Sequence, residues 1–553
     1  MRLKQKFFLS FIITFFTLSK IYGQQLSLKI DSKIESEKRI LSKINFQEKH
    51  KDSISLYKEV ERISTLLKRE GFFTNKISLI KKEKLNYTVF YELGKKIEKI
   101  ILFINKKNRL LLDLDRNKER TEVKTKELED YLNTLSLILD KKGKSFSKIK
   151  LSNFLIKGNT LNADLYIKET KERFIDDIII KGYTDFPKSY LKNYYKINSK
   201  SYFSKQKLNE LSLKTKSLKF TTEVKPPEVL FTKDSTKLYL YLKKIKNNSF
   251  DGILNVGTKE NGDIHLNGYL DLKLNNTFNT GESFNLFWNR INEERQEFKV
   301  NTFLPYIFNS KISTDFSFSI YKQDSTFLNT TFNSKIYYNI NNKTNLAITY
   351  DSEKSDNLLD NTFTDIESYN SKFIGIEFKY TIPNNDFFRN NKFLIAIKPS
   401  FGKRETLFSN TNQQKIKTSI SYLFSLNRKN QLYLSNEFGF LNSDNYLDNE
   451  LYRIGGVNSI RGFAEQSVFT NNYTFFNIEY RFLTSNKSYL YSITDIGRTK
   501  TKQITDNLFG FGLGYLFSTK NSLIDLSIVT NKSNERNLKF QNALMNLKWT
   551  SFF

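Results

Sequence analysis

The 553-residue sequence predicts a protein of two parts, a series of α+β repeats followed by an all-β transmembrane antiparallel barrel of about sixteen strands. Helical and strand patterns alternate before residue 247, whereas strand patterns fill almost all of the chain after it. The later strands have one apolar and one polar face, which is typical of a membrane barrel. Aromatic residues make up 15% of the chain although its mean hydropathy is −0.50, and an apolar outside around a polar lumen reconciles these two values.

Residues 1–23 are expected to be a secretory signal peptide. A basic start precedes the apolar run from Phe7 to Leu18, and Gly23 marks a plausible cleavage point. The alternative is a membrane anchor, which the short length of the run disfavours. The chain has no cysteine, so disulfides, thiolate metal sites and lipoprotein anchoring are excluded.

A net charge of +30 raises the question of nucleic-acid binding. The lysines are scattered and often stand next to acidic residues, so the sequence shows no clustered basic face. Nucleic acid is therefore not expected as a partner, and a basic lumen or basic periplasmic surfaces are the preferred interpretation.

The first part is predicted to consist of three units of roughly 75 residues, at 24–94, 95–170 and 171–246. Each unit is expected to contain a strand, two helices and two further strands. The expected helices lie at 58–70, 126–139, 188–195 and 205–218, and the expected strands at 76–81, 86–93, 97–104, 148–156, 161–168, 174–181, 221–230 and 237–244. The opening strand and first helix of the first unit are not defined by the pattern. An unrelated α+β periplasmic domain is the alternative.

Residues 247–553 are predicted to form the barrel. Its alternation is clear near residue 376, where Ile374, Ile376 and Phe378 share one face and Glu377 points to the other. About eleven strands lie between Ser249 and Phe440, and about five more between Tyr473 and Phe553. Sixteen strands are too many for one sandwich, and the number is even, as bacterial outer-membrane barrels require.

The connection between the eleventh and twelfth strands carries the most informative motif, Arg-Ile-Gly-Gly-Val-Asn-Ser-Ile-Arg-Gly-Phe, which ends at Phe463. Gly455 and Gly456 allow the backbone to reverse, and Gly462 allows it to approach the barrel wall. Arg461 is costly inside a membrane barrel unless it is paired. The motif is therefore predicted to be functional.

This motif resembles the Ile/Val-Arg-Gly-Phe/Tyr loop of the BamA/TamA superfamily. These proteins are outer-membrane β-barrels with periplasmic POTRA domains, and they insert or translocate other proteins. The resemblance implies that the three repeats are POTRA domains, and that Arg461 folds into the lumen to meet Asp495, with Glu479 as a second acceptor. The family's Phe-x-Asp-x-Gly strand is matched only at Asp495 and Gly497, because Ile493 replaces the aromatic residue. The alternative is an exposed turn at Arg461 and acids that line a wet lumen.

Both ends of the barrel carry a further pattern. Trp549 and Phe553 share an apolar face in the last strand, which resembles the family's C-terminal assembly signal and also suits a strand that faces lipid. Gly252 and Gly257 weaken pairing in the first strand. The resemblance implies that the seam between the first and last strands opens sideways, so that an incoming strand pairs with the exposed edge.

No residues are assigned to catalysis, a metal or a cofactor. The two histidines, His50 and His265, have no partner at metal spacing and are expected to be solvated. The chain lacks a nucleophile elbow and a phosphate-binding loop, so enzymatic activity is not expected.

The resemblance implies an outer-membrane assembly or translocation factor, more TamA-like than BamA-like, with its POTRA domains in the periplasm of a Gram-negative cell. Its expected partners are unfolded outer-membrane proteins, outer-membrane lipids and a periplasmic or inner-membrane-anchored accessory subunit. Two alternatives stay open. One is a secretion pore of the two-partner type, disfavoured by the lack of a proline-rich linker in a chain with only 6 Pro. The other is a passive porin with periplasmic binding domains.

Overall fold

The computed structural model describes residues 25–258, 264–291, 295–359, 365–384, 386, 388, 391–501, 504–534, 537–539, 541 and 543–553. The expected signal peptide lies outside these residues. Within this part of the chain, no helix has both the length and the apolar character needed to cross a membrane.

The first α/β domain contains six elements. They are β1 (Leu26–Asp31), α2 (Glu35–Leu41), β2 (Lys49–His50), α3 (Ser53–Arg69), β3 (Lys76–Glu83) and β4 (Asn86–Glu92). The sheet order is β2-β1-β4-β3, with β1 parallel to β4. The long helix α3 begins where the Asp52 carboxylate accepts the backbone N–H of Ser55 at 2.7 Å. Its Leu56, Ile63 and Leu67 side chains are buried against the sheet.

The second domain repeats this topology with the sheet order β6-β5-β8-β7, whereas the third has a three-stranded sheet, β10-β13-β12, and a separate strand pair, β11-β9. The second contains β5 (Lys99–Phe103), α4 (Lys106–Leu111), β6 (Arg120–Lys124), η1 (Thr125–Glu127), α5 (Leu128–Lys141), β7 (Lys148–Lys157) and β8 (Thr160–Lys168). The third contains β9 (Phe174–Ile175), β10 (Asp177–Lys181), α6 (Lys188–Asn193), β11 (Ser201–Tyr202), α7 (Lys205–Lys216), β12 (Thr221–Phe231) and β13 (Thr236–Lys244). In each domain the opening strand runs parallel to the closing strand, as β5 does to β8 and β10 to β13.

One edge strand of each domain shares a further property. The pairing of β3 with β4, of β7 with β8 and of β12 with β13 is interrupted by a register shift. These edge strands also carry exposed apolar side chains, among them Leu79, Phe154 and Val224. Bulges at unpaired edges limit edge-to-edge aggregation. In all three domains the corresponding edge strand is therefore accessible, but only part of it can pair with another strand.

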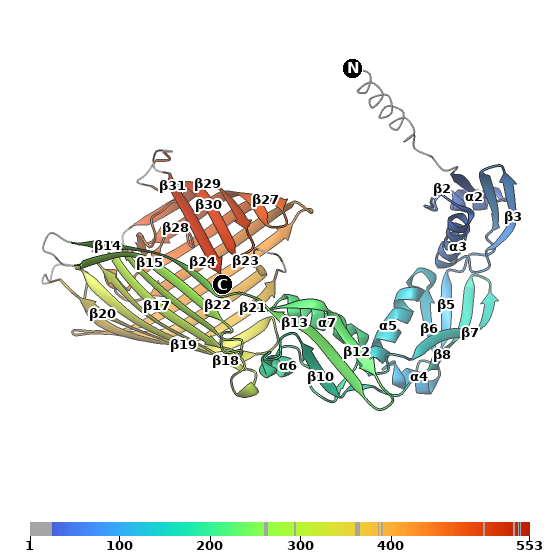
Figure 1. The fold of residues 1–553 in the computed structure, drawn as a ribbon, viewed down its shortest axis with the longest axis horizontal. Coiled ribbons are helices and arrows are strands. Elements are labelled where there is room, and N and C mark those ends of the chain that lie inside the picture. The colour runs from blue at the N-terminus through green and yellow to red at the C-terminus, as the bar shows by residue number, and fades with distance from the viewer. Residues whose placement is uncertain are drawn as a thin grey trace, which may run out of the picture. The chain divides into compact units, whose positions relative to one another are not determined.

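The sixteen barrel strands form a closed antiparallel sheet (Figure 1). They are β14 (Ser249–Thr258), β15 (Ile264–Asn275), β16 (Ser283–Ile291), β17 (Arg295–Leu304), β18 (Ile312–Gln323), β19 (Phe327–Asn339), β20 (Thr344–Asn357), β21 (Tyr369–Pro383), β22 (Asn391–Thr406), β23 (Asn410–Ser425), β24 (Asn430–Asn442), β27 (Asn472–Ser485), β28 (Ser488–Lys500), β29 (Thr505–Ser518), β30 (Ser522–Lys532) and β31 (Leu544–Phe552). The short η2 (Ile307–Asn309) lies between β17 and β18. The predicted fold class, with eleven strands before the long loop and five after it, is confirmed.

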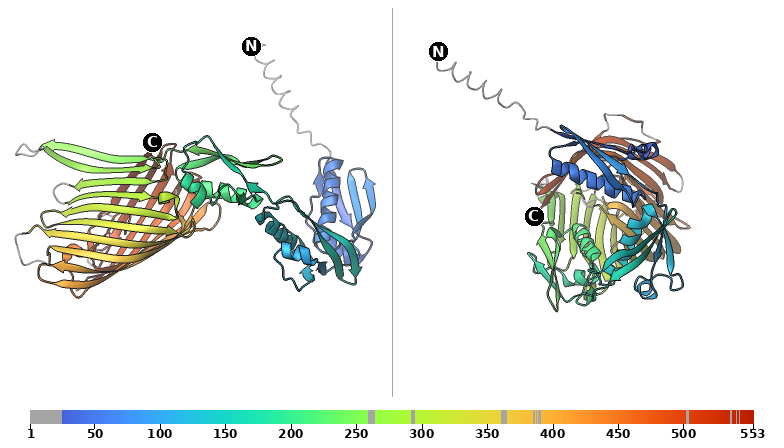
Figure 2. Two further views of the ribbon diagram at one scale, coloured as in Figure 1. Left: turned by 90° about the horizontal axis from the view of Figure 1, so that it is seen from below. Right: turned by 90° about the vertical axis from the view of Figure 1, so that its right-hand side faces the viewer.

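The strands are tilted side by side around the barrel (Figure 2), and their two faces differ as predicted. On β21, Ile374 and Ile376 are more than half exposed on the outside, whereas Phe373 and Glu377 are buried toward the lumen. An apolar exterior suits lipid, and the polar interior accommodates the charged side chains.

The third domain is attached to the turns that follow β15 and β17 of the barrel. Tyr190 on α6 packs edge-on against Tyr306, in the turn after β17, with ring centroids 5.0 Å apart. The Tyr183 hydroxyl donates to Asn279 at 2.7 Å and accepts from Asn276 at 2.6 Å, both in the turn after β15. Because aromatic packing and hydrogen bonds act together here, this domain is held against the early half of the barrel.

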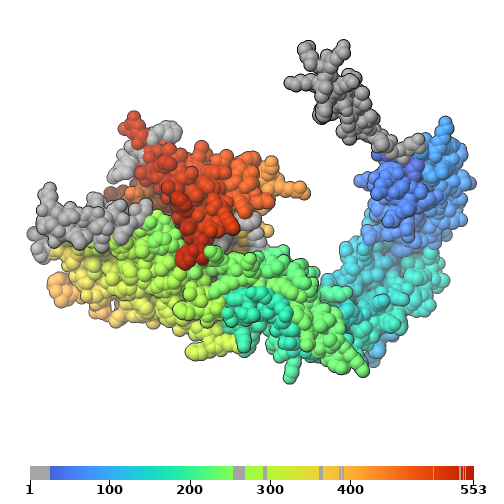
Figure 3. Space-filling model, viewed as in Figure 1, coloured from blue at the N-terminus to red at the C-terminus, as the bar shows by residue number. Residues whose placement is uncertain are grey.

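The seam between β14 and β31 is short. Among the described residues the register joins Ser249 to Phe552 and Phe250 to Ser551, whereas β14 and β15 pair along ten positions. The Phe553 N–H donates to the Asn248 carbonyl at 3.0 Å, so the C-terminus ends on the segment that enters the first strand (Figure 3).

Candidate functional site

The long loop between β24 and β27 enters the barrel. It contains η3 (Asp448–Glu450) and a small hairpin of β25 (Tyr452–Ile454) and β26 (Val468–Thr470). Its apolar residues Ile454, Ile460 and Phe463 are buried together with Phe475 of β27 and Leu508 of β29. The tip of the loop is therefore packed on the inner wall rather than exposed as a turn.

Arg461 makes the polar contacts of the tip. Its guanidinium donates to both Asp495 oxygens, from Nε at 2.9 Å and Nη2 at 2.6 Å, and its backbone N–H reaches the same carboxylate at 2.8 Å. A second guanidinium nitrogen, Nη1, donates to Glu479 at 2.5 Å. All three side chains are buried. Charge-assisted, two-oxygen contacts of this kind fix both position and orientation.

Arg481 completes the charge balance of the site. Its Nε donates to the second Glu479 oxygen at 2.8 Å, and its guanidinium lies over the rings of Tyr433 and Tyr489. The cluster therefore contains two arginines and two carboxylates. A polar cavity of about 400 Å³ adjoins it, so the lumen is not filled by the loop at this level.

Two glycines explain how the loop backbone comes so close to the wall. Gly462 has φ +91°, and its carbonyl accepts a hydrogen bond from the Asn531 amide of β30. Gly510 of β29 lies beneath the Arg461 carbonyl, where a Cβ atom would collide with that oxygen. Gly497, which the sequence singles out, is covered by the Ile460 side chain. Gly455 and Gly456 also have positive φ.

A second anchor, which the sequence does not reveal, holds the root of the same loop. Arg404 of β22, fully buried, donates to Glu450 at 2.5 Å, and the Gln413 amide of β23 donates to the other Glu450 oxygen at 2.8 Å. The neighbouring Asn449 donates to Ser355 of β20 at 2.6 Å and accepts from Asn329 of β19 at 2.8 Å. The loop is thus fastened to β19–β23 at its root and to β27–β30 at its tip.

Comparisons with known proteins identify a related family and structures of similar fold. Residues 249–517 match the model of the family described as haemolysin secretion/activation protein ShlB/FhaC/HecB. CdiB from Acinetobacter baumannii is similar in structure, with a TM-score of 0.53 and 14% identity over 91% of this chain and 99% of that one. CdiB from Escherichia coli gives 0.50 and 13% over 89% and 98%.

The barrel part of the chain therefore matches a family of the BamA/TamA superfamily. BamA from Haemophilus ducreyi lacking POTRA domains 1–3 also matches, at a TM-score of 0.45 and 13% identity over 81% of this chain and 96% of that one. No curated protein sequence gives a significant match. The match of residues 249–517 confirms the resemblance at the level of the superfamily, whose members are outer-membrane transport and assembly barrels.

The remaining predicted positions lie away from the Arg461 cluster. Gly252 stands two residues beyond the last described pair of the seam, and Gly257 lies further along β14, opposite His265. Trp549 in β31 and Phe553, the residue after this strand, are both about half exposed. Neither pair contacts the Arg461 cluster in the described part of the chain.

The expectation for His50 is wrong. The side chain is 3% exposed, and its Nε2 lies 2.7 Å from the Gln47 carbonyl oxygen, so it is a buried hydrogen-bonding residue rather than a solvated one. A short local turn brings the two together, which composition alone does not show. The His265 side chain lies outside the described residues. Among the described residues, no cluster of three or more His, Cys, Asp or Glu side chains is arranged for a metal ion.

Proposed function

We propose that this barrel is an outer-membrane secretion pore that exports one dedicated polypeptide, or a small set, as in two-partner secretion. The match of residues 249–517 to a family described by haemolysin secretion and activation carries the proposal. It favours the pore over the TamA-like assembly role that the sequence motif alone suggests. In this proposal the protein performs no chemical step, and its three α/β domains lie in the periplasm.

The periplasmic mouth of the barrel supports this role. A cavity of about 550 Å³ lies between the end of α7 and the turns after β21, β27 and β29. Its charged lining residues are one aspartate and five lysines, namely Asp386, Lys216, Lys219, Lys246, Lys487 and Lys520. A positive entrance attracts acidic polypeptide segments, and the field is strongest where low-dielectric walls enclose it.

The accessible edges of β3, β7 and β12 supply a way to hold an unfolded polypeptide. An extended segment that pairs with such an edge gains main-chain hydrogen bonds that do not depend on its sequence. The recurring register shift shortens the stretch that can pair, so binding at each edge is weak and reversible. Repeated weak contacts suit a chain that must be passed onward.

The doubly anchored loop is the gate in this proposal. With Arg461 and Arg404 both paired, the loop occupies the lumen and limits leakage. Export requires the loop to move or the polypeptide to pass beside it, through the polar cavity next to the tip. The cluster at Arg461 therefore positions the loop tip. If the tip moves, the hydrogen bonds from Arg461 to Asp495 and Glu479 must break and be replaced by other contacts.

A second candidate is insertion of outer-membrane proteins. The short described seam between β14 and β31 favours it, because an edge with few pairs opens at lower cost. Partners in that case are unfolded barrel proteins, assisted by membrane lipids and an accessory subunit.

Depletion of the protein, followed by quantitative proteomics of both the outer membrane and the medium, separates these functions. Loss of one or a few proteins from the medium, with the outer-membrane barrels unchanged, is the expected result. Broad loss of barrel proteins would contradict the pore and favour the insertase. No loss in either fraction would contradict both and leave a passive porin.

A further inference from the structure

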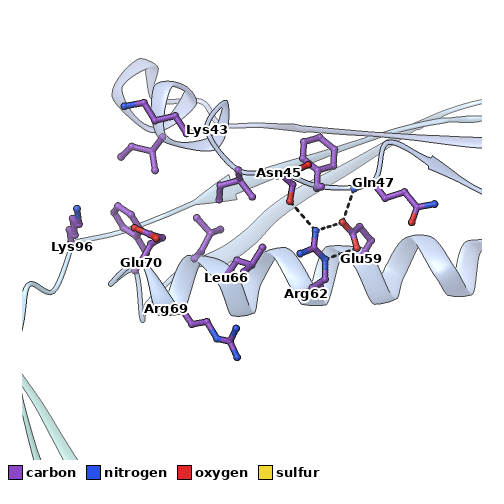
Figure 4. Close-up of a pocket in the computed structure, with 14 residues that line it drawn as sticks. Lys43, Asn45, Gln47, Glu59, Arg62, Leu66, Arg69, Glu70 and Lys96 are labelled. Atoms are coloured by element: carbon purple, nitrogen blue, oxygen red, sulfur yellow. Dashed lines mark hydrogen bonds and ion pairs between the residues drawn. The ribbon is translucent and has the colours of Figure 1, made fainter. Parts of the chain in front are cut away.

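The first α/β domain carries an open groove that the export function does not explain. It has a volume of about 1010 Å³ and lies between the end of α2, the segment that follows it and α3 (Figure 4). Its apolar floor includes the half-buried side chains of Ile40, Ile44, Phe46 and Leu66. None of its lining residues belongs to a strand.

The groove is preformed by a hydrogen-bond network at one end. Arg62 donates to Glu59 through Nε at 2.8 Å and Nη2 at 2.6 Å, and also to the Asn45 carbonyl at 3.0 Å. The Gln47 N–H donates to the same Glu59 carboxylate at 2.8 Å. These contacts, drawn in Figure 4, hold residues 45–47 above α3. A wall that is already fixed requires little ordering when a ligand binds.

The charges on the rim favour an acidic ligand. Glu59 is neutralised by Arg62, Glu70 pairs with Lys126 at 3.0 Å, and Arg69 pairs with Glu129. Lys43 and Lys96 also line the groove, and neither forms an ion pair with any residue that the structure describes. Two available cations therefore flank an apolar floor.

The absence of a strand in the lining decides the form of the ligand. Strand addition needs an unpaired strand edge, and the lining of this groove offers only side chains and helix surface. A helix with apolar residues at i, i+3, i+4 and i+7 fills such a groove with its apolar side. Carboxylates beside that side reach the rim lysines.

We infer that this groove binds an acidic amphipathic helix within the polypeptide that the pore exports. The site is distinct from the strand edges, because the groove recognises side chains of the bound polypeptide, whereas the strand edges bind its main chain. The inference that the helix belongs to the exported polypeptide rests on the proposed export function. The inference that the groove binds an acidic amphipathic helix rests on the groove alone. The groove thus provides the client selectivity that sequence-independent edge pairing lacks.

The binding test uses the full-length protein in lipid nanodiscs and two fluorescent 18-residue helical peptides. Both have leucine at i, i+3, i+4 and i+7, and they differ in having glutamate or lysine beside the leucines. Fluorescence anisotropy is expected to show at least ten-fold tighter binding of the glutamate peptide. The exposed double variant Lys43→Glu/Lys96→Glu should remove that preference, while Lys58→Glu/Lys68→Glu, with the same charge change outside the groove, should keep it.

Each alternative result overturns the inference. Equal binding of the two peptides, no binding by the unaltered protein, or equal effects of the two double variants would show that the groove is not the receptor. Ile44→Ser tests the apolar floor separately and should weaken binding while hydrogen exchange of α3 stays unchanged. Unchanged affinity in that variant would equally contradict the assignment.

The source of the helix is tested in cells with a photo-crosslinking amino acid in place of Lys43. Crosslinking to a protein that disappears from the medium on depletion would support the inference. Crosslinking to a resident periplasmic protein, or to none, would overturn the source. If depletion removes no protein from the medium but the glutamate peptide still binds more tightly than the lysine peptide, export is refuted while binding of an acidic helix in the groove is supported. The failure of the proposed function can thus be told from the failure of this inference.

Discussion

Replacement of Arg461 by alanine is expected to release the loop tip from the barrel wall. The change removes three side-chain hydrogen bonds, two to Asp495 and one to Glu479. Glu479 retains Arg481, but Asp495 is 0% exposed and loses its charged partner. Removing one member of a buried ion pair costs about 3–5 kcal/mol. At about 1.4 kcal/mol per factor of ten, the released state should become roughly a hundred- to a few thousand-fold more populated.

The absence of cysteine from the chain makes this measurable. Ile460 is completely buried beside Arg461, so an Ile460→Cys thiol reacts with a maleimide only when the tip lifts. The labelling rate in nanodiscs should rise by the stated factor when Arg461→Ala is added. Arg498→Ala, an exposed arginine on the same strand as Asp495, is the matched control and should leave the rate unchanged. A rise below about three-fold with Arg461→Ala would refute the view that this cluster holds the tip.

Three further outcomes are expected. Arg404→Ala leaves Glu450 without its charged partner, so hydrogen exchange of residues 443–451 should accelerate strongly, while the Ile460→Cys thiol stays protected from maleimide. If this thiol were labelled as fast as in the Arg461→Ala variant, the root and the tip of the loop would not be anchored independently. Gly510→Val places side-chain atoms against the loop backbone and should raise the same labelling rate at least ten-fold, whereas an unchanged rate would show that the loop does not rest on this strand. Hydrogen bonds from Arg62 outweigh the effect of burial and hold the pKa of Glu59 below its ordinary value. The stability that these bonds add is therefore complete above about pH 4.3, the pKa of Glu59 in the unfolded chain, and is lost as pH falls through the lower pKa of Glu59 in the folded protein. The hydrogen-exchange protection factors of α3, which correct for the intrinsic pH dependence of exchange, should therefore fall as pH drops below about 4.3, and Glu59→Gln should flatten that change; identical profiles would contradict the role of the pair.

The barrel was the more predictable part because a strand between lipid and water must alternate with period two. That rule places Ile374 outside and Glu377 inside, and it yields the strand number and the place of the loop. The short elements β1, α2, α4 and β6 have five to seven residues and escaped the pattern, because so few residues repeat a helical or strand period too few times to be recognised. Packing in the assembled domain stabilises them rather than local propensity.

At the site, the motif led to Arg461 and, through the family's strand pattern, to Asp495. The Arg404–Glu450 pair was not accessible in this way, since its members are 46 positions apart and neither stands in a motif. Gly510 was missed for another reason. It lies in a regular strand, and the need for a missing Cβ becomes visible only when the opposing loop backbone is in place.

The attachment of the third domain to the turns of the early barrel strands has a mechanical consequence. The aromatic contacts of Tyr190 and the hydrogen bonds of Tyr183 fix one side of that domain, while residues 245–248 connect its last strand directly to β14. A force applied to the domain therefore acts as a torque whose pivot is the tyrosine contact. The load arrives at Asn248, where Phe553 is hydrogen-bonded, so it acts as shear on the junction between β14 and β31, which has two paired positions among the described residues.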